Sequence, residues 1–491
     1  MPEEGNRNAS KTGNYETAIG VEVHVELATA TKLFCACKAS FGGKPNTHVC
    51  PYCLGMPGTL PVLNRQALEL ALSVGVALHC TIPAWSRFDR KNYFYPDNPQ
   101  NYQVSQWFHP LCKEGYVEIE IKEDAPKRIG IWNLHLEEDA GKLFQDEADQ
   151  TLLDANRAGV PLIEIVSAPD MQSAEEVLAF LDVLKTTIGY LQASDCKLQE
   201  GSMRVDVNLS VRKAGETALG TRTEMKNLNS FRAITRAINA ERERQIGILE
   251  AGGSVLQETR RWDDAKGTSY SMRSKEEAMD YRYFPDPDLP CVYITEEDLA
   301  RVRAAQPEMR KDRKRRFVEE FGLPEYDAGL LTQSIHLANL FENTARLGIA
   351  PKKVSNFLMG EGLRLLREKE LDPADVKASP EHLAALLRLH DENKITNTVA
   401  KEVFAEVFLN DIDPESYVAE HGLLTVREEG VLRKTVERVV EENQKSVADY
   451  LGGKEKALGF LVGQTMKAMR GQADPAAVMA LLKEILDQSV I

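Results

Sequence analysis

The first strand-like segment of the chain carries residues that could bind a metal ion. Residues 19–27 alternate between apolar and polar side chains, which predicts a half-buried β-strand. With a side-chain period of two, Glu22, His24 and Glu26 share one face of that strand. Taken alone, such a row is typical of the solvated face of an antiparallel sheet. A cation site therefore needs further ligands from elsewhere in the chain.

Two further carboxylates could complete such a site. Glu138 belongs to an acidic run that ends in a Gly-Lys turn, and Glu164 lies inside an otherwise apolar strand. Burying Glu164 without a partner would cost on the order of several kcal/mol, so it must meet a cation or an arginine. Together with Glu22 these residues offer oxygen ligands, which suit Mg²⁺, whereas His24 would also admit Mn²⁺ or Zn²⁺. An ion pair between Glu164 and Arg157 is the alternative.

Four cysteines form two close pairs, Cys35 with Cys37 and Cys50 with Cys53, and twelve residues separate the pairs. This spacing is typical of two short loops that close around one tetrahedral Zn²⁺. His48 is a substitute ligand in the same segment. Because four thiolates leave no open coordination position, we expect a structural zinc at about one ion per chain. Isolated buried thiols are the alternative.

Two aromatic segments, 90–97 and 280–286, each lead into a Pro-Asp pair. An aromatic strand followed by a turn is the ordinary interpretation. Basic residues between flat rings also suit stacking on a base while neutralising phosphate. On that interpretation the candidate contacts to ATP or to the 3′ end of an RNA are Arg90, Lys91, Tyr93 and Tyr95, and Lys142 at the end of the acidic run is a further candidate. The chain contains neither a P-loop nor a G-x-G-x-x-G motif, so any nucleotide site uses another cradle.

The composition is that of a globular protein without a membrane anchor. The chain has 491 residues, a formal net charge of −15 and 27% charged residues. The N-terminal residues lack the apolar core of a signal peptide, and no apolar run is long enough to span a bilayer. We therefore expect a cytoplasmic protein with reduced cysteines. The acidic balance argues against wholesale wrapping by nucleic acid and leaves room for a local basic patch.

The residue pattern changes near Cys291, because all eight cysteines and all four tryptophans occur at or before it. Alternating strands and interleaved helices precede this point, which predicts a mixed α/β region, and helical periodicity follows it. Helices are expected from Asn64 or Arg65, from about Ser173, where Ser173 and Glu176 fit a capping box, and from near Ser230. The expected domains are a flexible extension over 1–14, the α/β region over 15–300, and helical domains over 301–415 and 416–491.

Long motifs in a fixed order resemble the family of the B subunit of aspartyl/glutamyl-tRNA(Asn/Gln) amidotransferases. The likeness covers nearly the whole chain from about Tyr15. The motifs that carry it are residues 20–27, 88–97, 135–142, 156–166, 226–231, 280–285 and 459–464. Two positions depart from the family pattern: Gln145 stands where a histidine is expected, and Ala168 replaces an acidic residue. Neither departure is one of the proposed metal ligands.

The resemblance implies an enzyme activity that acts on tRNA mischarged with Glu or Asp. The family phosphorylates the side-chain carboxylate with ATP, and ammonia then displaces the phosphate. A separate amidase-type subunit supplies the ammonia from glutamine, and the complex is braced by a small third subunit. The implied fold is an α/β cradle-type catalytic domain, an all-helical domain and a small helical tail domain that contacts the tRNA.

The resemblance also implies site residues and cofactors. A magnesium ion sits in the synthetase site of the family, and some relatives hold zinc through the paired cysteines. The matching magnesium ligands in this sequence are Glu22, His24, Glu138 and Glu164. Glu26 is not among them, and nothing beyond its spacing supports it as a ligand.

The C-terminal region carries a local positive charge, with four basic residues and one acidic residue over 454–471. Such a patch suits phosphate contacts, although an exposed helix face would look the same. We expect Lys456, Lys467 and Arg470 to contact the tRNA. Two other functions remain open: a metal-dependent phosphotransferase or ligase that acts on a small carboxylate without RNA, and a zinc-bearing RNA-binding scaffold without catalysis.

Overall fold

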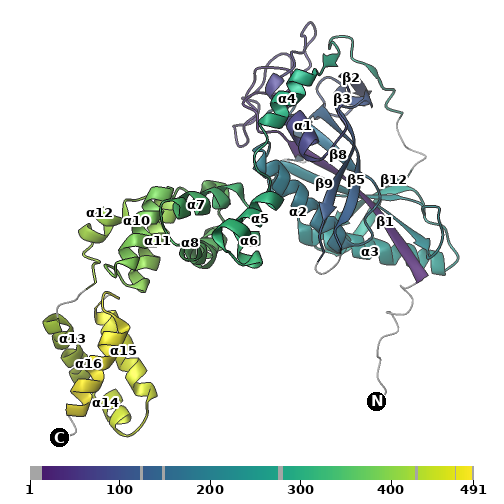
Figure 1. Ribbon diagram of the computed structural model, residues 1–491. Helices are drawn as coiled ribbons and strands as arrows, with labels where there is room; N and C mark the ends of the chain where they lie inside the picture. Colours follow the sequence, from purple (N-terminus) through teal and green to yellow (C-terminus); the bar gives the residue numbers. More distant parts are fainter. Residues whose placement is uncertain are drawn as a thin grey trace, which may run out of the picture. The chain divides into compact units, whose positions relative to one another are not determined.

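The computed structural model describes residues 14–121, 125–145, 150–274, 280–425, 429–469 and 471–488. The chain divides into two compact units, residues 1–309 and residues 310–491, and each is described by itself (Figure 1). Except for Asn14, the expected extension over 1–14 lies outside the described residues, as does Arg470. Among the described residues, no helix is both long and apolar enough to cross a membrane.

An eight-stranded sheet organises the first unit, with the strand order β12-β11-β10-β9-β1-β8-β5-β4. All neighbours in it are antiparallel except β10 and β11. The first strand of the chain therefore lies inside the sheet, between β9 and β8. The strands are β1 (Tyr15–Glu26), β4 (Cys112–Ile119), β5 (Lys127–Glu138), β8 (Pro161–Ser167), β9 (Met203–Lys213), β10 (Thr223–Lys226), β11 (Glu258–Asp263) and β12 (Thr268–Ser274).

Shorter strands form two smaller sheets in the same unit. In one, β2 pairs with β3, β13 and β14, and in the other β6 pairs with β7. Side chains of β3 reach the large sheet, where Gln106 Oε1 accepts a 2.9 Å hydrogen bond from the Leu136 amide. The strands are β2 (Trp85–Asn92), β3 (Tyr102–His109), β6 (Lys142–Gln145), β7 (Thr151–Asp154), β13 (Phe284–Pro285) and β14 (Val292–Tyr293).

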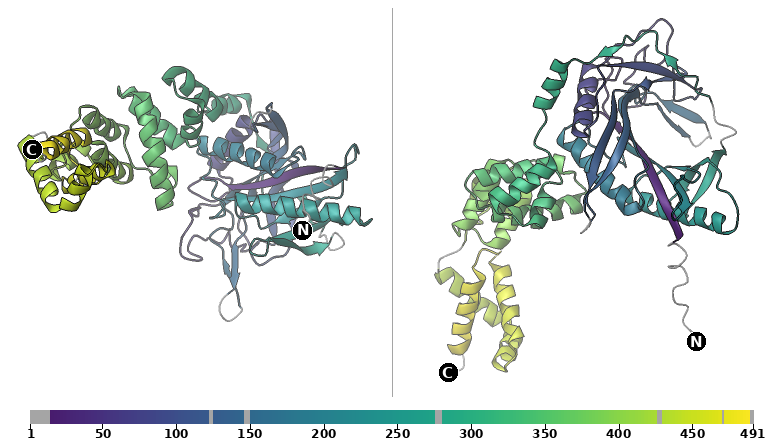
Figure 2. Two further views of the ribbon diagram at one scale, coloured as in Figure 1. Left: turned by 90° about the horizontal axis from the view of Figure 1, so that it is seen from below. Right: turned by 45° about the vertical axis from the view of Figure 1, so that its right-hand side comes forward.

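The two faces of β1 have opposite environments because its side chains alternate. Val21, Val23 and Val25 are fully buried in one hydrophobic core. Residues of α2 (Ala174–Tyr190) and α3 (Phe231–Glu250) belong to the same core, and these two long helices lie along the sheet (Figure 2). The opposite face of β1 carries the polar row. The packing of the helices therefore fixes which face remains available for chemistry.

The expected helix starts are confirmed. The capping box expected at Ser173 is half formed, because Glu176 Oε2 accepts a hydrogen bond from the Gln172 amide at 2.7 Å instead of from the Ser173 amide. The side chain of Asn64 caps α1 (Arg65–Ala77), Ser173 caps α2 and Ser230 caps α3 by accepting from backbone amides of the first turn. One further helix of this unit is α4 (Glu296–Ala304), which begins with a capping box.

The described residues of the second unit form helices around two hydrophobic cores. The first core includes side chains from Phe317 to Leu423, and the second includes side chains from Val436 to Leu486. The helices are α5 (Arg310–Phe321), α6 (Glu325–Leu331), α7 (Ile335–Arg346), α8 (Pro351–Phe357), a π-helix (Leu358–Gly362), α9 (Leu363–Lys369), a 3₁₀-helix (Pro373–Asp375), α10 (Pro380–Asp391), α11 (Asn397–Asn410), α12 (Pro414–Glu420), α13 (Glu429–Glu442), α14 (Gln444–Leu451), α15 (Lys456–Ala468) and α16 (Pro475–Gln488).

The fold class is confirmed: a mixed α/β region precedes a helical one. The expected boundary between residues 415 and 416 stays a prediction. Val418 and Leu423, which follow it in sequence, pack in the first helical core, and the second core begins at Val436.

Candidate functional site

Strand pairing brings together the polar side chains of three neighbouring strands. His24 of β1 and His135 of β5 both lie opposite Glu164 of β8. The Glu164 Oε2 atom is 3.3 Å from His24 Nε2 and 3.5 Å from His135 Nε2. Glu137 Oε1 is 3.6 Å from His24 Nε2. The ligand atoms of His24, Glu137 and Glu164 lie within 4.8 Å of one another, which makes them a candidate cation group, called group A below.

Glu138 is not part of group A, although the sequence suggested it as the fourth ligand. On β5 the period of two places Glu137 on the face of His135, so Glu138 points to the opposite face. There Glu138 is buried, with Oε1 3.4 Å from the Tyr52 hydroxyl and Oε2 3.4 Å from the Val104 amide nitrogen. Burial raises the pKa of Glu138 to about 8. In the structure Glu137, and not Glu138, therefore belongs to the candidate site.

Glu22 joins a second acidic group rather than group A. Its carboxylate lies with those of Asp206 on β9 and Glu224 on β10, again with ligand atoms within 4.8 Å, and this set is called group B. Lys226 Nζ donates to Asp206 at 2.5 Å and pairs with Glu224 at 2.8 Å. Because Glu22 and His24 are two residues apart on one strand face, the two groups are adjacent.

Sequence reasoning missed Asp206 and Glu224 as candidate ligands. The alternation along residues 203–211 did place Asp206 on a polar strand face. That signal could not show that β9 pairs with β1 and sets Asp206 opposite Glu22.

The pKa shifts in and around group A show that its carboxylates and the two histidines influence one another strongly. Burial opposes the charged form of Glu164, yet the positive charges of His135 and His24 hold its pKa well below the ordinary value. Burial likewise opposes the imidazolium form of His135, but Glu164 and Glu137 raise its pKa to about 10. For Glu22, burial and then the Glu164 carboxylate raise the pKa. His24 and the neighbouring His135 thus face the Glu137 and Glu164 carboxylates, and a histidine here would release its ring proton on binding a cation.

A cavity of about 570 Å³ opens beside group B, and Asp206 is one of its lining residues. Arg157 and Arg204 also line it, and both pair with Asp139, at 3.5 Å and 2.8 Å respectively. The alternative of a Glu164–Arg157 ion pair is not what the structure shows. Glu26 lines the same cavity, and burial followed by the Asp139 carboxylate raises its pKa to about 8.

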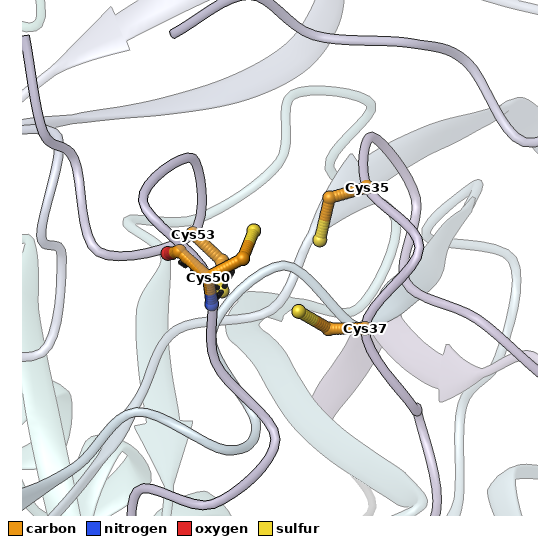
Figure 3. A group of neighbouring side chains, drawn as sticks. All are labelled: Cys35, Cys37, Cys50 and Cys53. Carbon is orange, nitrogen blue, oxygen red and sulfur yellow. Dashed lines mark hydrogen bonds between the residues drawn. The ribbon is translucent and has the colours of Figure 1, made fainter.

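The four paired cysteines converge on one point (Figure 3). Their sulfur atoms lie within 4.8 Å of one another, and the Sγ atoms of Cys50 and Cys53 are 3.9 Å apart. Tetrahedral Zn²⁺ with bonds of about 2.3 Å requires sulfur atoms about 3.8 Å apart, so this donor set fits zinc. A hydrogen bond from Cys35 holds the pKa of the Cys53 thiol well below its ordinary value. The quartet is complete without His48, which is not one of its members.

A glycine fixes the turn that follows the second cysteine pair. Gly55 has φ +68°, and a Cβ atom there would lie 2.4 Å from the Pro99 carbonyl oxygen. Only glycine combines this backbone conformation with so close an approach.

The two aromatic segments lie against each other in the structure. The backbone amide of Asn92 donates to the Tyr281 carbonyl at 2.9 Å, and the Lys91 ammonium lies 5.0 Å from the centre of the Tyr281 ring. Arg90 is engaged by Asp286 at 2.8 Å and is therefore held in an internal ion pair. The Arg90 guanidinium also lies 4.2 Å from the centre of the Tyr102 ring.

The remaining candidate contacts are scattered. Tyr93 is half-buried, and burial followed by the Asp97 carboxylate raises its pKa. Tyr95 is exposed, and Lys142 lines the cavity. In the second unit, Lys456 and Lys467 are exposed at the two ends of α15.

The fold and the acidic groups define a class: a protein whose α/β unit carries two candidate cation groups on one sheet face and whose second unit is helical in its described residues. Residues 17–300 match the family described as GatB/GatE catalytic domain, and residues 339–486 match the GatB domain. The chain belongs to the GatB family.

Curated relatives match almost the whole chain. The protein of Agathobacter rectalis is 58% identical over 474 residues, which is 96% of this chain and 100% of the relative. That of Lachnospira eligens is 57% identical over 480 residues, covering 96% and 99%. That of Caldicellulosiruptor bescii is 53% identical over 478 residues, covering 96% and 99%. All three are named as the B subunit of an aspartyl/glutamyl-tRNA(Asn/Gln) amidotransferase.

Proposed function

We propose that this chain is the synthetase subunit of a glutamine-dependent tRNA amidotransferase. Its substrates are Glu-tRNA(Gln), Asp-tRNA(Asn) or both. A side-chain carboxylate oxygen attacks the γ-phosphorus of ATP and ADP leaves. Ammonia then attacks the carbonyl carbon of this acyl phosphate. Phosphate is released, and the side-chain amide remains on the tRNA. The names of the relatives and the pair of adjacent acidic groups on one sheet face support this proposal.

The observation that carries the proposal is the adjacency of groups A and B. Phosphoryl transfer to a carboxylate consists mostly of positioning and charge neutralisation. Divalent cations, Mg²⁺ in the first place, would supply that neutralisation when bound. His24 and Glu164 of group A, and Glu22 and Asp206 of group B, are the principal residues that would hold them. All four stand on strands, which hold ligands more rigidly than loops do.

The cavity beside group B suits the reacting ends of the substrates. Its volume of about 570 Å³ lies in the range of small-molecule sites. Arg157, Arg204 and Lys142 offer positive charge along its wall, although the two arginines are held by Asp139. This wall can orient phosphate or carboxylate groups and keep water away from the acyl phosphate.

The other parts of the proposal concern partners and the zinc centre. An amidase-type glutaminase subunit delivers ammonia, the complex is braced by a small third subunit, and the exposed lysines of α15 contact the tRNA in the cytoplasm. Zn²⁺ occupies the four-cysteine centre, where it has a structural role because no coordination position stays open. Metal analysis of the reduced, chelator-free chain should find about one zinc per chain.

The deciding experiment purifies the complex with the amidase subunit and measures amidation of Glu-tRNA and Asp-tRNA. Activity that requires ATP, mischarged tRNA and either glutamine or ammonium supports the proposal. ATP cleavage that free glutamate stimulates without tRNA would instead indicate a small-carboxylate ligase. RNA binding without any amidation, and unchanged in Glu164→Gln, would indicate a non-catalytic scaffold.

A further inference from the structure

Lys32 is a fully buried lysine beside the four-cysteine centre. It follows β1 in the loop that carries the first cysteine pair, and its backbone amide donates to the Cys37 carbonyl at 2.9 Å. Its aliphatic stem passes Gly159, where a Cβ atom would lie 3.6 Å from Lys32 Cδ and 3.8 Å from Cys53 Cβ. The loop thus directs the ammonium group inward, toward the second cysteine pair.

The partners of this ammonium group are unusual for a buried lysine. Lys32 Nζ donates to Cys53 Sγ at 3.5 Å and to the Ala155 carbonyl oxygen at 3.2 Å. In the part of the chain that the structure describes, Lys32 forms no ion pair with a carboxylate. A buried cation is costly unless an anion faces it, and a neutral thiol does not meet that need. A metal-bound thiolate does.

We propose that Lys32 is a positioning residue of the four-cysteine metal centre, where its hydrogen bond to Cys53 Sγ offsets thiolate charge and stabilises the bound Zn²⁺. This inference rests on the zinc centre proposed above. Four thiolates around Zn²⁺ carry a formal net charge of −2, and a cation in the surrounding low dielectric lowers the energy of that charge. The second hydrogen bond, to Ala155, fixes the ammonium group in place.

Lys38, another lysine of the same loop, differs from Lys32 in its surroundings. Lys38 follows Cys37 directly, but it is exposed to solvent. Removing the charge of Lys38 changes the net charge of the loop by the same amount without removing a contact to sulfur. Lys38→Met is therefore the matched control for Lys32→Met.

The test measures zinc affinity of the full-length chain by competition with a chromophoric chelator. Outer-shell partners of metal ligands typically contribute about 10–100-fold in affinity, and a loss in that range is expected for Lys32→Met. The zinc affinity of Lys32→Arg, which keeps the charge and the hydrogen-bond donors, should be much closer to that of the parent. The zinc affinity of Lys38→Met should equal that of the parent. If Lys32→Met does not fold, Lys32→Gln is compared with Lys32→Arg, and the same order is expected.

A second readout separates a hydrogen bond to sulfur from mere packing. With Co²⁺ in place of Zn²⁺, the sulfur-to-cobalt charge-transfer band should move to lower energy in Lys32→Met, because the thiolate loses its donor. The band should keep its position in Lys38→Met. A parent chain that binds no zinc would overturn the metal centre itself. A parent that binds zinc, with equal affinity and an unmoved band in the Lys32 variants, would overturn only the role of Lys32.

Discussion

The acidic groups of the sheet and the four-cysteine centre gather negative charge in different ways. Groups A and B place carboxylates on paired strands, and Asp206 of group B lines the cavity of about 570 Å³. The cysteines stand on two loops that close on one another, with a buried lysine against one sulfur. An open site with oxygen ligands suits exchange of substrate, whereas a closed site of sulfur ligands suits permanent structure. On the proposed function, the carboxylate groups serve the reaction and the four-cysteine centre serves the stability of the fold.

Breaking group A should have the largest effect on amidation. Glu164→Gln removes the carboxylate that two histidines face. We expect amidation of mischarged tRNA with saturating ammonium to fall by about a hundred-fold or more, as for loss of a preorganised electrostatic group. Glu16→Gln is the control, because Glu16 is on β1 but pairs with Arg212 outside both groups. Equal turnover of the parent and Glu164→Gln would remove group A from the mechanism.

Removing a ligand of the cysteine centre should lower the thermal stability of the chain more than it lowers the amidation rate. Cys53→Ser removes one of four sulfur ligands, so the bound metal loses affinity and the two loops lose their cross-link. We expect the melting temperature to fall by about 5 °C or more, with reduced zinc content. Thermal unfolding with metal analysis checks this. A variant without zinc but with the melting temperature of the parent would show that the centre does not support the fold.

The neighbours Glu137 and Glu138 offer the sharpest comparison within one strand. Glu137 faces His24, whereas Glu138 faces Tyr52 and Val104 on the opposite side. We expect Glu137→Gln to lower amidation about ten-fold or more with little loss of stability. Glu138→Gln should keep the amidation rate close to that of the parent, because burial already favours its protonated form. The reverse result would restore the ligand set suggested by the sequence.

The helical unit provides a buried carboxylate without any ligand role, and its effect should be the smallest. Arg313 and Arg316 both hydrogen-bond Glu342 and, although burial opposes them, lower its pKa to about 2. Because the folded-state pKa lies below the unfolded value, this stabilisation is present above about pH 4.3 and is lost as the pH falls toward 2. Glu342→Gln should cost about 2 kcal/mol near neutral pH.

The pH dependence is what tests the assignment of Glu342. Urea unfolding at several pH values should show the difference between the parent and Glu342→Gln shrinking as the pH falls from about 4.3 toward 2. A difference that stays constant across this range would mean that charge is not its source.

Much of the fold followed from local patterns. The N-caps at Asn64, Ser173 and Ser230 and the alternation along β1 depend on neighbouring residues, so the sequence alone could specify them. The grouping of the four cysteines could likewise be predicted, because the short spacing within each cysteine pair is a local feature of the sequence. The apolar neighbours of Glu164 indicated its strand, and the structure places the residue there half-buried.

The remainder of the site depends on contacts between distant segments. A register irregularity between Ile131 and Asn133 affects how β5 pairs with β8, so the sequence could not tell whether Glu137 or Glu138 faces His24. The partners of Glu22 depend on β9 lying next to β1, which no periodicity reveals. Lys32 resembled any loop lysine, because its burial arises from Gly159 and Cys53.

The central claim is that the acidic sheet face activates the substrate carboxylate. The direct test follows formation of ADP from ATP in the assembled complex, with Glu-tRNA or Asp-tRNA added and with glutamine and ammonium left out. The account predicts tRNA-stimulated ATP cleavage in the parent and in Glu16→Gln, and none above background in Glu164→Gln. Undiminished tRNA-stimulated cleavage in Glu164→Gln would contradict it.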